Sequence, residues 1–250
     1  MTAFNFTSLP LILVDKLTST NNYATGLLAS GNLPEGAVIL TFRQTHGRGH
    51  GKNVWESEDF KNLTFSMVLF PGFLPASRQF LLSQVVSLGL YDFLVSKTGK
   101  VSIKWPNDLL INEKKVAGIL IENSVTGTHL SSSVIGIGIN INQPSFPDHL
   151  SQATSLTLST GKIFSLDLTL KEITDEILKW YQLLKQGRSR LVRGTYLQHL
   201  FRLGEKSLFR REGRLFEAKI TGIDDYGQLQ IENSSGEKET CPFKSLEFVF

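Results

Sequence analysis

The period of the apolar positions changes several times along the chain, and each change marks a different kind of element. In the first two thirds, short apolar runs bounded by glycine, proline and polar residues predict β-strands. The predicted strands cover residues 9–14, 37–42, 62–70, 101–105, 109–111, 116–121 and 134–141. The polar turn Asn112-Glu113-Lys114 separates two of them and therefore predicts a hairpin.

Apolar residues at helical spacing predict four helices among and after these strands. The first begins at one of the N-cap candidates between Thr18 and Asn21 and ends before Gly31. The other three cover about 77–96, 165–185 and 189–201. The apolar stripe of the 165–185 helix belongs to the core.

Beyond Leu203 the pattern changes to short strand-like runs separated by turns that contain glycine. These runs cover residues 207–210, 215–223, 228–232 and 246–250. The spacing is typical of a small all-β barrel. We therefore predict a domain boundary near residue 203, which divides the chain into 1–203 and 204–250.

The run from Val134 to Ile141 alternates glycine with isoleucine, so one face of this predicted strand is bare backbone. Either a ligand lies flat on that face, or the face packs closely against a helix. The sequence leaves both interpretations open.

Composition and charge narrow the class of protein. The chain has 250 residues, of which 41% are hydrophobic, and a net charge of +3. The group Arg210, Arg211 and Arg214 is too small a basic cluster to indicate a nucleic-acid-binding protein. The single cysteine, Cys241, excludes an intrachain disulfide and fits a reducing cytoplasm. The sequence has no secretory signal and no run of about 20 apolar residues, so we expect a cytoplasmic protein without a membrane span.

The segment from Gln44 to Trp55 carries the densest candidate chemistry. It follows the predicted strand 37–42 and holds three glycines, two histidines, Arg48 and Lys52. Glycines let a backbone fold closely around a ligand, and cations with free N–H groups favour an anion. We expect an anion-binding loop that is neither helix nor strand. A second dense segment follows at Lys104-Trp105-Pro106-Asn107-Asp108.

Four segments, in matching order and spacing, resemble the biotin–protein ligases, which attach biotin to a lysine of carboxylase carrier domains. The four segments are Ser19-Thr20-Asn21, Gln44 with Gly47-Arg48-Gly49 and Trp55, Lys104-Trp105-Pro106-Asn107-Asp108-Leu109, and Lys115-Val116-Ala117-Gly118-Ile119-Leu120. They are similar to the family's Ser-Thr-Asn helix start, its biotin-binding loop, and its Lys-Trp-Pro-Asn-Asp-Leu and Lys-x-Ala-Gly-Ile-Leu motifs. The resemblance covers residues 9–250.

The resemblance implies a fold and a reaction. The fold is α+β, a mixed sheet flanked by helices and similar to class II aminoacyl-tRNA synthetase cores, with a C-terminal SH3-like barrel. The implied substrates are biotin and ATP, with Mg²⁺. The biotin carboxylate attacks the α-phosphate of ATP and gives biotinyl-5′-adenylate and pyrophosphate. A lysine of a biotin carboxyl carrier domain then attacks the mixed anhydride and releases AMP.

The resemblance also implies roles for individual residues. Lys115 and Arg48 are the expected catalytic residues, because cations between a carboxylate and a polyphosphate reduce their repulsion. The expected biotin-binding residues are Ser19, Thr20, Asn21, Gln44, Arg48, Gly49, His50, Lys115 and Gly118. The expected ATP or adenylate contacts are Lys52, Asn53, Trp55, Lys104, Asn107, Asp108 and Asn140, and Asp108 is the expected Mg²⁺ ligand. Structural roles stay open beside these: helix capping for Ser19 and Thr20, and a turn cap for Asn107-Asp108.

Two departures from the family bear on function. His50 stands where bacterial members commonly have arginine, so we expect the loop to hold the adenylate partly through Lys52 and less tightly. The chain starts eight residues before the first predicted strand, so we expect no helix-turn-helix domain and no DNA binding. A monomer or weak homodimer is expected.

Two other functions stay open from the sequence. A lipoate– or octanoate–protein ligase or transferase shares the catalytic fold but lacks the Lys-Trp-Pro-Asn-Asp segment. A non-catalytic biotin-sensing regulator would need a DNA- or partner-binding module, or the loss of the catalytic lysine.

Overall fold

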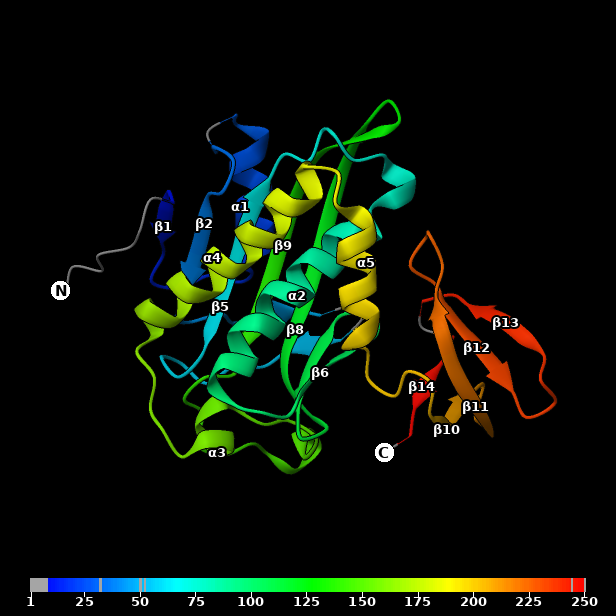
Figure 1. Ribbon diagram of the computed structural model, residues 1–250. Coiled ribbons are helices and arrows are strands. Elements are labelled where there is room, and N and C mark those ends of the chain that lie inside the picture. Colours follow the sequence, from blue (N-terminus) through cyan, green and yellow to red (C-terminus); the bar gives the residue numbers. More distant parts are fainter. Residues whose placement is uncertain (1–8, 32, 50, 52, 244, 250) are drawn as a thin grey trace.

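A seven-stranded mixed sheet forms the centre of the protein (Figure 1). The structure is a computed structural model and describes residues 9–31, 33–49, 51, 53–243 and 245–249. The strands lie in the order β1 (Leu11–Leu13), β2 (Val38–Thr41), β5 (Leu63–Leu69), β9 (His129–Ile139), β8 (Lys114–Thr126), β7 (Asp108–Ile111) and β6 (Val101–Lys104). Only the β1–β2 pair is parallel among the neighbours in this sheet.

Helices cover both faces of this sheet. Three of them, α2 (Phe80–Lys97), α4 (Leu166–Lys185) and α5 (Ser189–Gln198), lie across one face in Figure 1. Side chains alternate across each strand, so Phe65 and Met67 of β5 join the large core under these helices. Val68 points the other way and packs with Ala24 of α1 (Thr20–Ala29). The short helix α3 (Leu156–Thr160) comes after β9 in the chain, and 3₁₀ turns lie at Ala76–Arg78 and Asp148–Leu150.

Helix α2 is the central core helix. Gly89 lies where α2 crosses α4, and a Cβ there would be 2.7 Å from the Ile177 backbone, so only glycine allows this close crossing. Within the described part of the chain, Ala76–Lys97 is a segment long and apolar enough to cross a membrane, but 67% of its window is buried inside the protein. Its hydrophobicity is explained by the burial of nearly every side of the helix.

The sequence-based prediction of an α+β fold is confirmed. The predicted strands and helices are present, with ends shifted by a few residues. The predicted hairpin turn has left-handed backbone angles at Asn112 and Glu113. Strand β8 runs on to Thr126, beyond the predicted end at residue 121, because it pairs with β9 along most of its length.

The expectation for the glycine-rich segment was partly wrong. Its two ends form a small antiparallel ladder of β3 (Gly47–Arg48) and β4 (Val54–Trp55). The ladder requires glycine at position 47, because a Cβ there would lie 2.2 Å from the carbonyl oxygen of Trp55. The segment is therefore a short hairpin rather than an irregular loop.

The last part of the chain forms a separate five-stranded antiparallel sheet. Its order is β13 (Lys238–Cys241), β12 (Leu229–Asn233), β11 (Arg214–Ile223), β10 (Lys206–Arg211) and β14 (Glu247–Phe248). The sequence pattern missed β13, because its first three residues are exposed and polar and only Cys241 is buried. The C-terminal all-β unit is as predicted, and the division into 1–203 and 204–250 stays a prediction.

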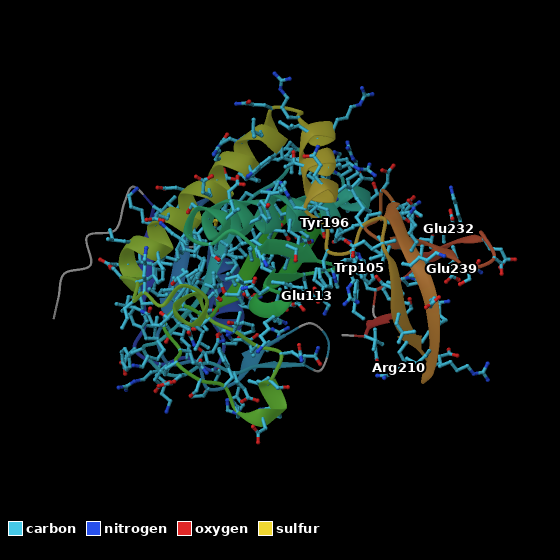
Figure 2. The ribbon with its side chains drawn as sticks, turned by 60° about the horizontal axis from the view of Figure 1, so that its bottom comes forward. Trp105, Glu113, Tyr196, Arg210, Glu232 and Glu239 are labelled. Atoms are coloured by element: carbon cyan, nitrogen blue, oxygen red, sulfur yellow. The ribbon has the colours of Figure 1, made fainter. Side chains whose placement is uncertain are left out.

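One aromatic side chain joins the two sheets. Trp105 follows β6, is 2% exposed, and donates a hydrogen bond of 2.8 Å from Nε1 to the carbonyl oxygen of Gly227. Its ring stacks on Phe243 at 5.4 Å between centroids. Figure 2 shows Trp105 on the side of the main body that faces the C-terminal strands. The Lys-Trp-Pro-Asn-Asp segment is thus held by two connecting segments of the C-terminal unit, the β11–β12 turn and the residues after β13.

Candidate active site

A cavity of about 110 Å³ opens between the start of α1, the β3–β4 hairpin and strands β7, β8 and β9. Residues from segments far apart in the chain form its wall. They are Ser19, Thr20, Asn21, Gln44, Arg48, Gly49, Asn53, Val54, Trp55, Asn107, Asp108, Lys115, Gly118, Ile119, Leu120, Gly136, Ile137 and Gly138. All four segments that carry the family resemblance therefore contribute to one cavity.

Glycines of β9 form the floor of the cavity. Ile135, Ile137 and Ile139 point into the core under the helices, so Gly136 and Gly138 face the opposite side. A Cβ on Gly138 would lie 2.2 Å from the Trp55 ring, and one on Gly136 would lie 2.4 Å from Asn21 Oδ1. The bare face therefore holds the Trp55 indole and the first turn of α1. The predicted close packing against a helix is confirmed at Gly136, and a ligand on this face stays a prediction.

The start of α1 supplies a neutral polar wall. Ser19 is the N-cap residue, and its side chain accepts a hydrogen bond from the Asn22 backbone N–H. The backbone N–H of Thr20 donates to Gln44 Oε1 at 3.0 Å. The Ser66 hydroxyl lies 2.8 Å from Thr20 Oγ1. Capping and cavity lining therefore occur together at this helix start.

A row of charges lies on the β6–β7–β8 side of the cavity. Lys115 Nζ lies 2.6 Å from Asp108 Oδ1, as an ion pair rather than an aligned hydrogen bond. Lys104 Nζ lies 3.6 Å from Asp108 Oδ2. Burial lowers the pKa of Lys104, and the Asp108 carboxylate opposes that shift. Two ammonium groups thus share one carboxylate beside the cavity.

Neighbouring contacts orient this part of the wall. Asn107 Nδ2 donates to the carbonyl oxygen of Ile119 at 2.8 Å, which ties the Lys-Trp-Pro-Asn-Asp segment to β8. The Lys115 ammonium lies 5.7 Å from the centre of the Trp55 ring. Lys114, one residue earlier in β8, is exposed and does not line the cavity.

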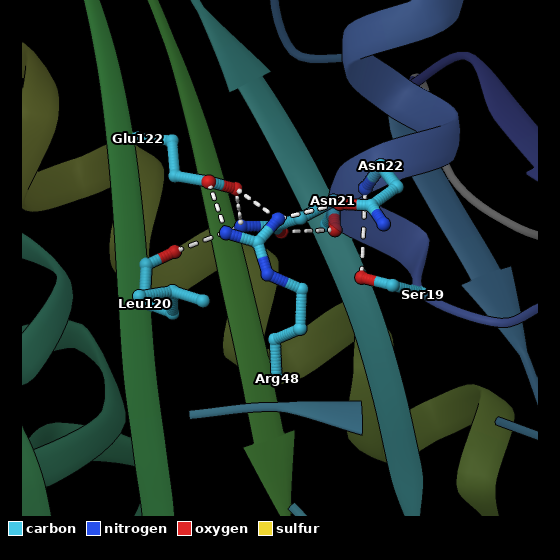
Figure 3. A network of polar contacts seen from close by, with 7 residues as sticks. Ser19, Asn21, Asn22, Arg48, Leu120 and Glu122 are labelled. Atoms are coloured by element: carbon cyan, nitrogen blue, oxygen red, sulfur yellow. Dashed lines mark hydrogen bonds and ion pairs between the residues drawn. The ribbon is translucent and has the colours of Figure 1, made fainter. Parts of the chain in front are cut away.

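The Arg48 side chain reaches from the hairpin to the start of α1 and to strand β8 (Figure 3). Its Nη2 lies 2.5 Å from Glu122 Oε1, and its Nη1 donates to Asn22 Oδ1 at 2.5 Å. Glu122 was not among the residues predicted from the sequence. The alternation of β8 could have indicated it, because Gly118, Leu120 and Glu122 fall on one face of a strand.

Most of the predicted site residues line the cavity, and two do not. Lys104 is not part of the cavity wall, and its Nζ lies 3.6 Å from Oδ2 of Asp108, which is part of it. Asn140 is buried behind the wall, where its Nδ2 donates to the Thr154 carbonyl oxygen at 3.0 Å. Two further predicted residues, His50 and Lys52, lie outside the described residues.

The role of Asp108 as a Mg²⁺ ligand stays a prediction. Among the described residues, no group of three or more His, Cys, Asp and Glu side chains is placed to hold a metal ion. The Asp108 carboxylate is already neutralised by two lysines. Magnesium prefers carboxylate and phosphate oxygens in an open octahedral arrangement, which these residues alone do not provide.

Comparisons with known proteins agree with this geometry. The model of the biotin/lipoate A/B protein ligase family matches residues 13–140. The chain is 33% identical to the bifunctional ligase/repressor BirA of Bacillus spizizenii, over 92% of this chain and 71% of the relative. It is 31% identical to a biotin–[acetyl-CoA-carboxylase] ligase of Paracoccus denitrificans, over 92% of this chain and 97% of the relative.

A solved structure shows the same architecture. The biotin protein ligase of Aquifex aeolicus, in complex with biotin and ATP, superposes with a TM-score of 0.80 at 27% identity. The match covers 96% of this chain and 98% of that one. The two sheets, the glycine floor and the convergence of four motifs thus occur in a chain that is similar to biotin ligases along nearly its whole length. The chain belongs to the biotin/lipoate A/B protein ligase family and, within it, to the biotin protein ligases.

Proposed function

We propose that the chain activates biotin with ATP and transfers it to a lysine of a biotin carboxyl carrier protein. The observation that carries the proposal is the convergence of Ser19, Gln44, Arg48 and Lys115 on one cavity. In the first step, a biotin carboxylate oxygen attacks the α-phosphorus of ATP and pyrophosphate leaves. In the second step, the acceptor amine attacks the carbonyl carbon, AMP leaves, and an amide bond forms.

The proposal gives the charged wall the task of neutralising the reactants. A carboxylate and a triphosphate repel each other, so they meet only where cations are already fixed. Lys115 is placed by β8 with its ammonium at the cavity, while Asp108 and the Trp55 ring restrict its direction. An ammonium held in this way needs little reorganisation when the negative charges arrive.

The neutral wall suits the other end of biotin. The ureido ring carries both hydrogen-bond donors and an acceptor but no charge, so amide and hydroxyl groups recognise it better than ions do. Ser19, Thr20 and Gln44 supply such groups at the start of α1. The charged and neutral walls lie on different sides of the cavity, which orients the biotin carboxylate toward Lys115.

The acceptor, the metal and the compartment are part of the proposal. The named relative from Paracoccus is a ligase for acetyl-CoA carboxylase, which supports a carboxylase carrier domain as acceptor. Magnesium enters with the ATP phosphates, and Asp108 is the carboxylate at the cavity wall that would complete its coordination. We place the reaction in the cytoplasm, where the free thiol of Cys241 stays reduced.

Biotin-dependent exchange of labelled pyrophosphate into ATP tests the first step, with lipoate and octanoate as alternative acids. We expect exchange with biotin, and its loss by about 100-fold or more in Lys115→Gln. Lys114→Gln is the matched control, because that neighbouring lysine is exposed and lies outside the cavity wall. Exchange with lipoate or octanoate but not with biotin would overturn the proposal. Equal loss in both lysine variants would show that Lys115 has no special role.

A further inference from the structure

Glu122 has the position of a residue that controls Arg48. It lies on β8 beyond the predicted motif, on the strand face that carries Gly118 and Leu120 of the cavity wall. Its two carboxylate oxygens lie 2.5 and 3.4 Å from the two terminal nitrogens of the Arg48 guanidinium. A fork of two N–H groups on one carboxylate fixes the plane of the guanidinium as well as its place.

The same carboxylate is itself fixed by the helix start. Asn21 Nδ2 donates to Glu122 Oε2 at 2.8 Å and to the Leu120 carbonyl oxygen at 3.2 Å. Asn21 Oδ1 lies 2.6 Å from the Ser66 hydroxyl, so both ends of this buried amide have partners. Glu122 is therefore anchored by a rigid side chain of the cavity wall, as Figure 3 shows.

We propose that Glu122 is a positioning residue, which holds the Arg48 guanidinium across the cavity so that the β3–β4 hairpin retains the adenylate. This inference rests on the proposed function. Arg48 has four side-chain bonds that rotate and belongs to a short two-stranded ladder, which is marginally stable alone. The contact with Glu122 fixes the Arg48 side chain before the ligand binds. Ligand binding therefore costs less conformational entropy.

A purely structural role fits this ion pair poorly. The Arg48 and Glu122 side chains are 44% and 35% exposed, and exposed ion pairs contribute little to folding. The contact joins segments 74 residues apart at the cavity and does not lie in either core cluster. Its loss should therefore change ligand retention far more than thermal stability.

Glu122→Gln is the sharpest test, because the amide keeps the size of the side chain and an oxygen that can accept from Asn21. We expect release of preformed biotinyl-5′-adenylate to become about fivefold faster, and the KM for biotin to rise by a similar factor. The melting temperature should stay that of the unchanged chain. Glu247→Gln is the matched control, because it weakens another exposed arginine pair, with Arg210 in the C-terminal sheet.

A double-mutant cycle separates action through Arg48 from other effects. In an Arg48→Ala background, Glu122→Gln should leave the adenylate release rate unchanged. An equal acceleration in both backgrounds would overturn the inference. Slower release in Glu122→Gln would also overturn it, because Glu122 would then compete with the ligand for the guanidinium instead of positioning it.

Trypsin cleavage after Arg48 gives a readout that needs no ligand. We expect cleavage about fivefold faster in Glu122→Gln than in the unchanged chain or in Glu247→Gln. Failure of the proposed function is distinguishable, because it appears as absent biotin-dependent exchange in the unchanged chain. Failure of the inference appears as unchanged cleavage and release in Glu122→Gln while the unchanged chain is active.

Discussion

Replacing Gly138 by alanine would test the contact between the cavity floor and the Trp55 indole. The added methyl group would lie 2.2 Å from Cε2 of the ring and 2.5 Å from Nε1. The ring must retreat by about 1.3 Å to reach an ordinary carbon contact of about 3.5 Å. Gly138 is in the middle of the sheet and cannot move in its place, because β9 pairs with β5 and β8 on both sides.

The movement should affect catalysis more than folding. Trp55 belongs to a two-residue strand of the small hairpin, so it can shift at a cost within the roughly 1–3 kcal/mol typical of overpacking. The shift also moves the hairpin that carries Arg48 and the ring beside Lys115. A displacement of about 1 Å at reacting groups can reduce a rate by about 100-fold.

Biotin-dependent pyrophosphate exchange measures the effect on activity, and thermal unfolding measures the effect on stability. We expect Gly138→Ala to lose exchange by about 100-fold with a small loss of stability. Gly194→Ala in α5 is the matched control, because nothing lies within 4 Å of the added methyl group. In a Trp55→Ala background, where the ring is gone, Gly138→Ala should have no further effect. Wild-type exchange in Gly138→Ala would refute the reasoning.

Three further predictions concern the rest of the fold. Trp105→Phe keeps a ring against Phe243 but leaves the Gly227 carbonyl oxygen without its donor, so we expect a loss of about 1–3 kcal/mol in urea unfolding. Tyr196→Phe should be neutral or stabilise the fold by about 1 kcal/mol, since its fully buried hydroxyl has no partner among the described residues; a clear loss would reveal an unseen partner. Burial lowers the pKa of His199 below its ordinary 6.5. The neutral imidazole therefore contributes fully to the free energy of unfolding above pH 6.5, and this contribution is lost as the pH falls through the lowered pKa. His199→Gln should therefore reduce the difference in urea midpoint between about pH 7.5 and about pH 5. An unchanged difference would show that His199 does not cause this pH dependence.

Most helices and strands could be predicted because the period of apolar residues that indicates each of them lies within the element itself. Alternating apolar residues indicated β5, and the helical stripe from Ile173 to Leu184 indicated α4. The same local rules failed where exposure or pairing decides the structure. Strand β13 has three exposed residues and is defined by its pairing with β12. The β3–β4 ladder depends on the close approach of Gly47 to Trp55, which a residue pattern does not show.

For the candidate site too, the sequence identified residues, whereas their positions came from the structure. The motifs named Ser19, Gln44, Arg48 and Lys115, and the structure brings all four to one cavity. The motifs also named Asn140, which the structure places behind the wall with a bond to the Thr154 carbonyl oxygen. A motif therefore identified residues near the site, but it did not say which of them face the cavity.

The sequence alone determined most of the elements, the chemistry-bearing segments and the family they resemble, because strand and helix periods and motif spacing are properties of neighbouring residues. Only the tertiary structure decided that the glycine face of β9 carries the Trp55 ring and that Arg48 meets Glu122. The physical reason is distance along the chain. Arg48 and Glu122 are 74 residues apart, and they meet only because the pairing of β5, β9 and β8 places β8 opposite the start of α1.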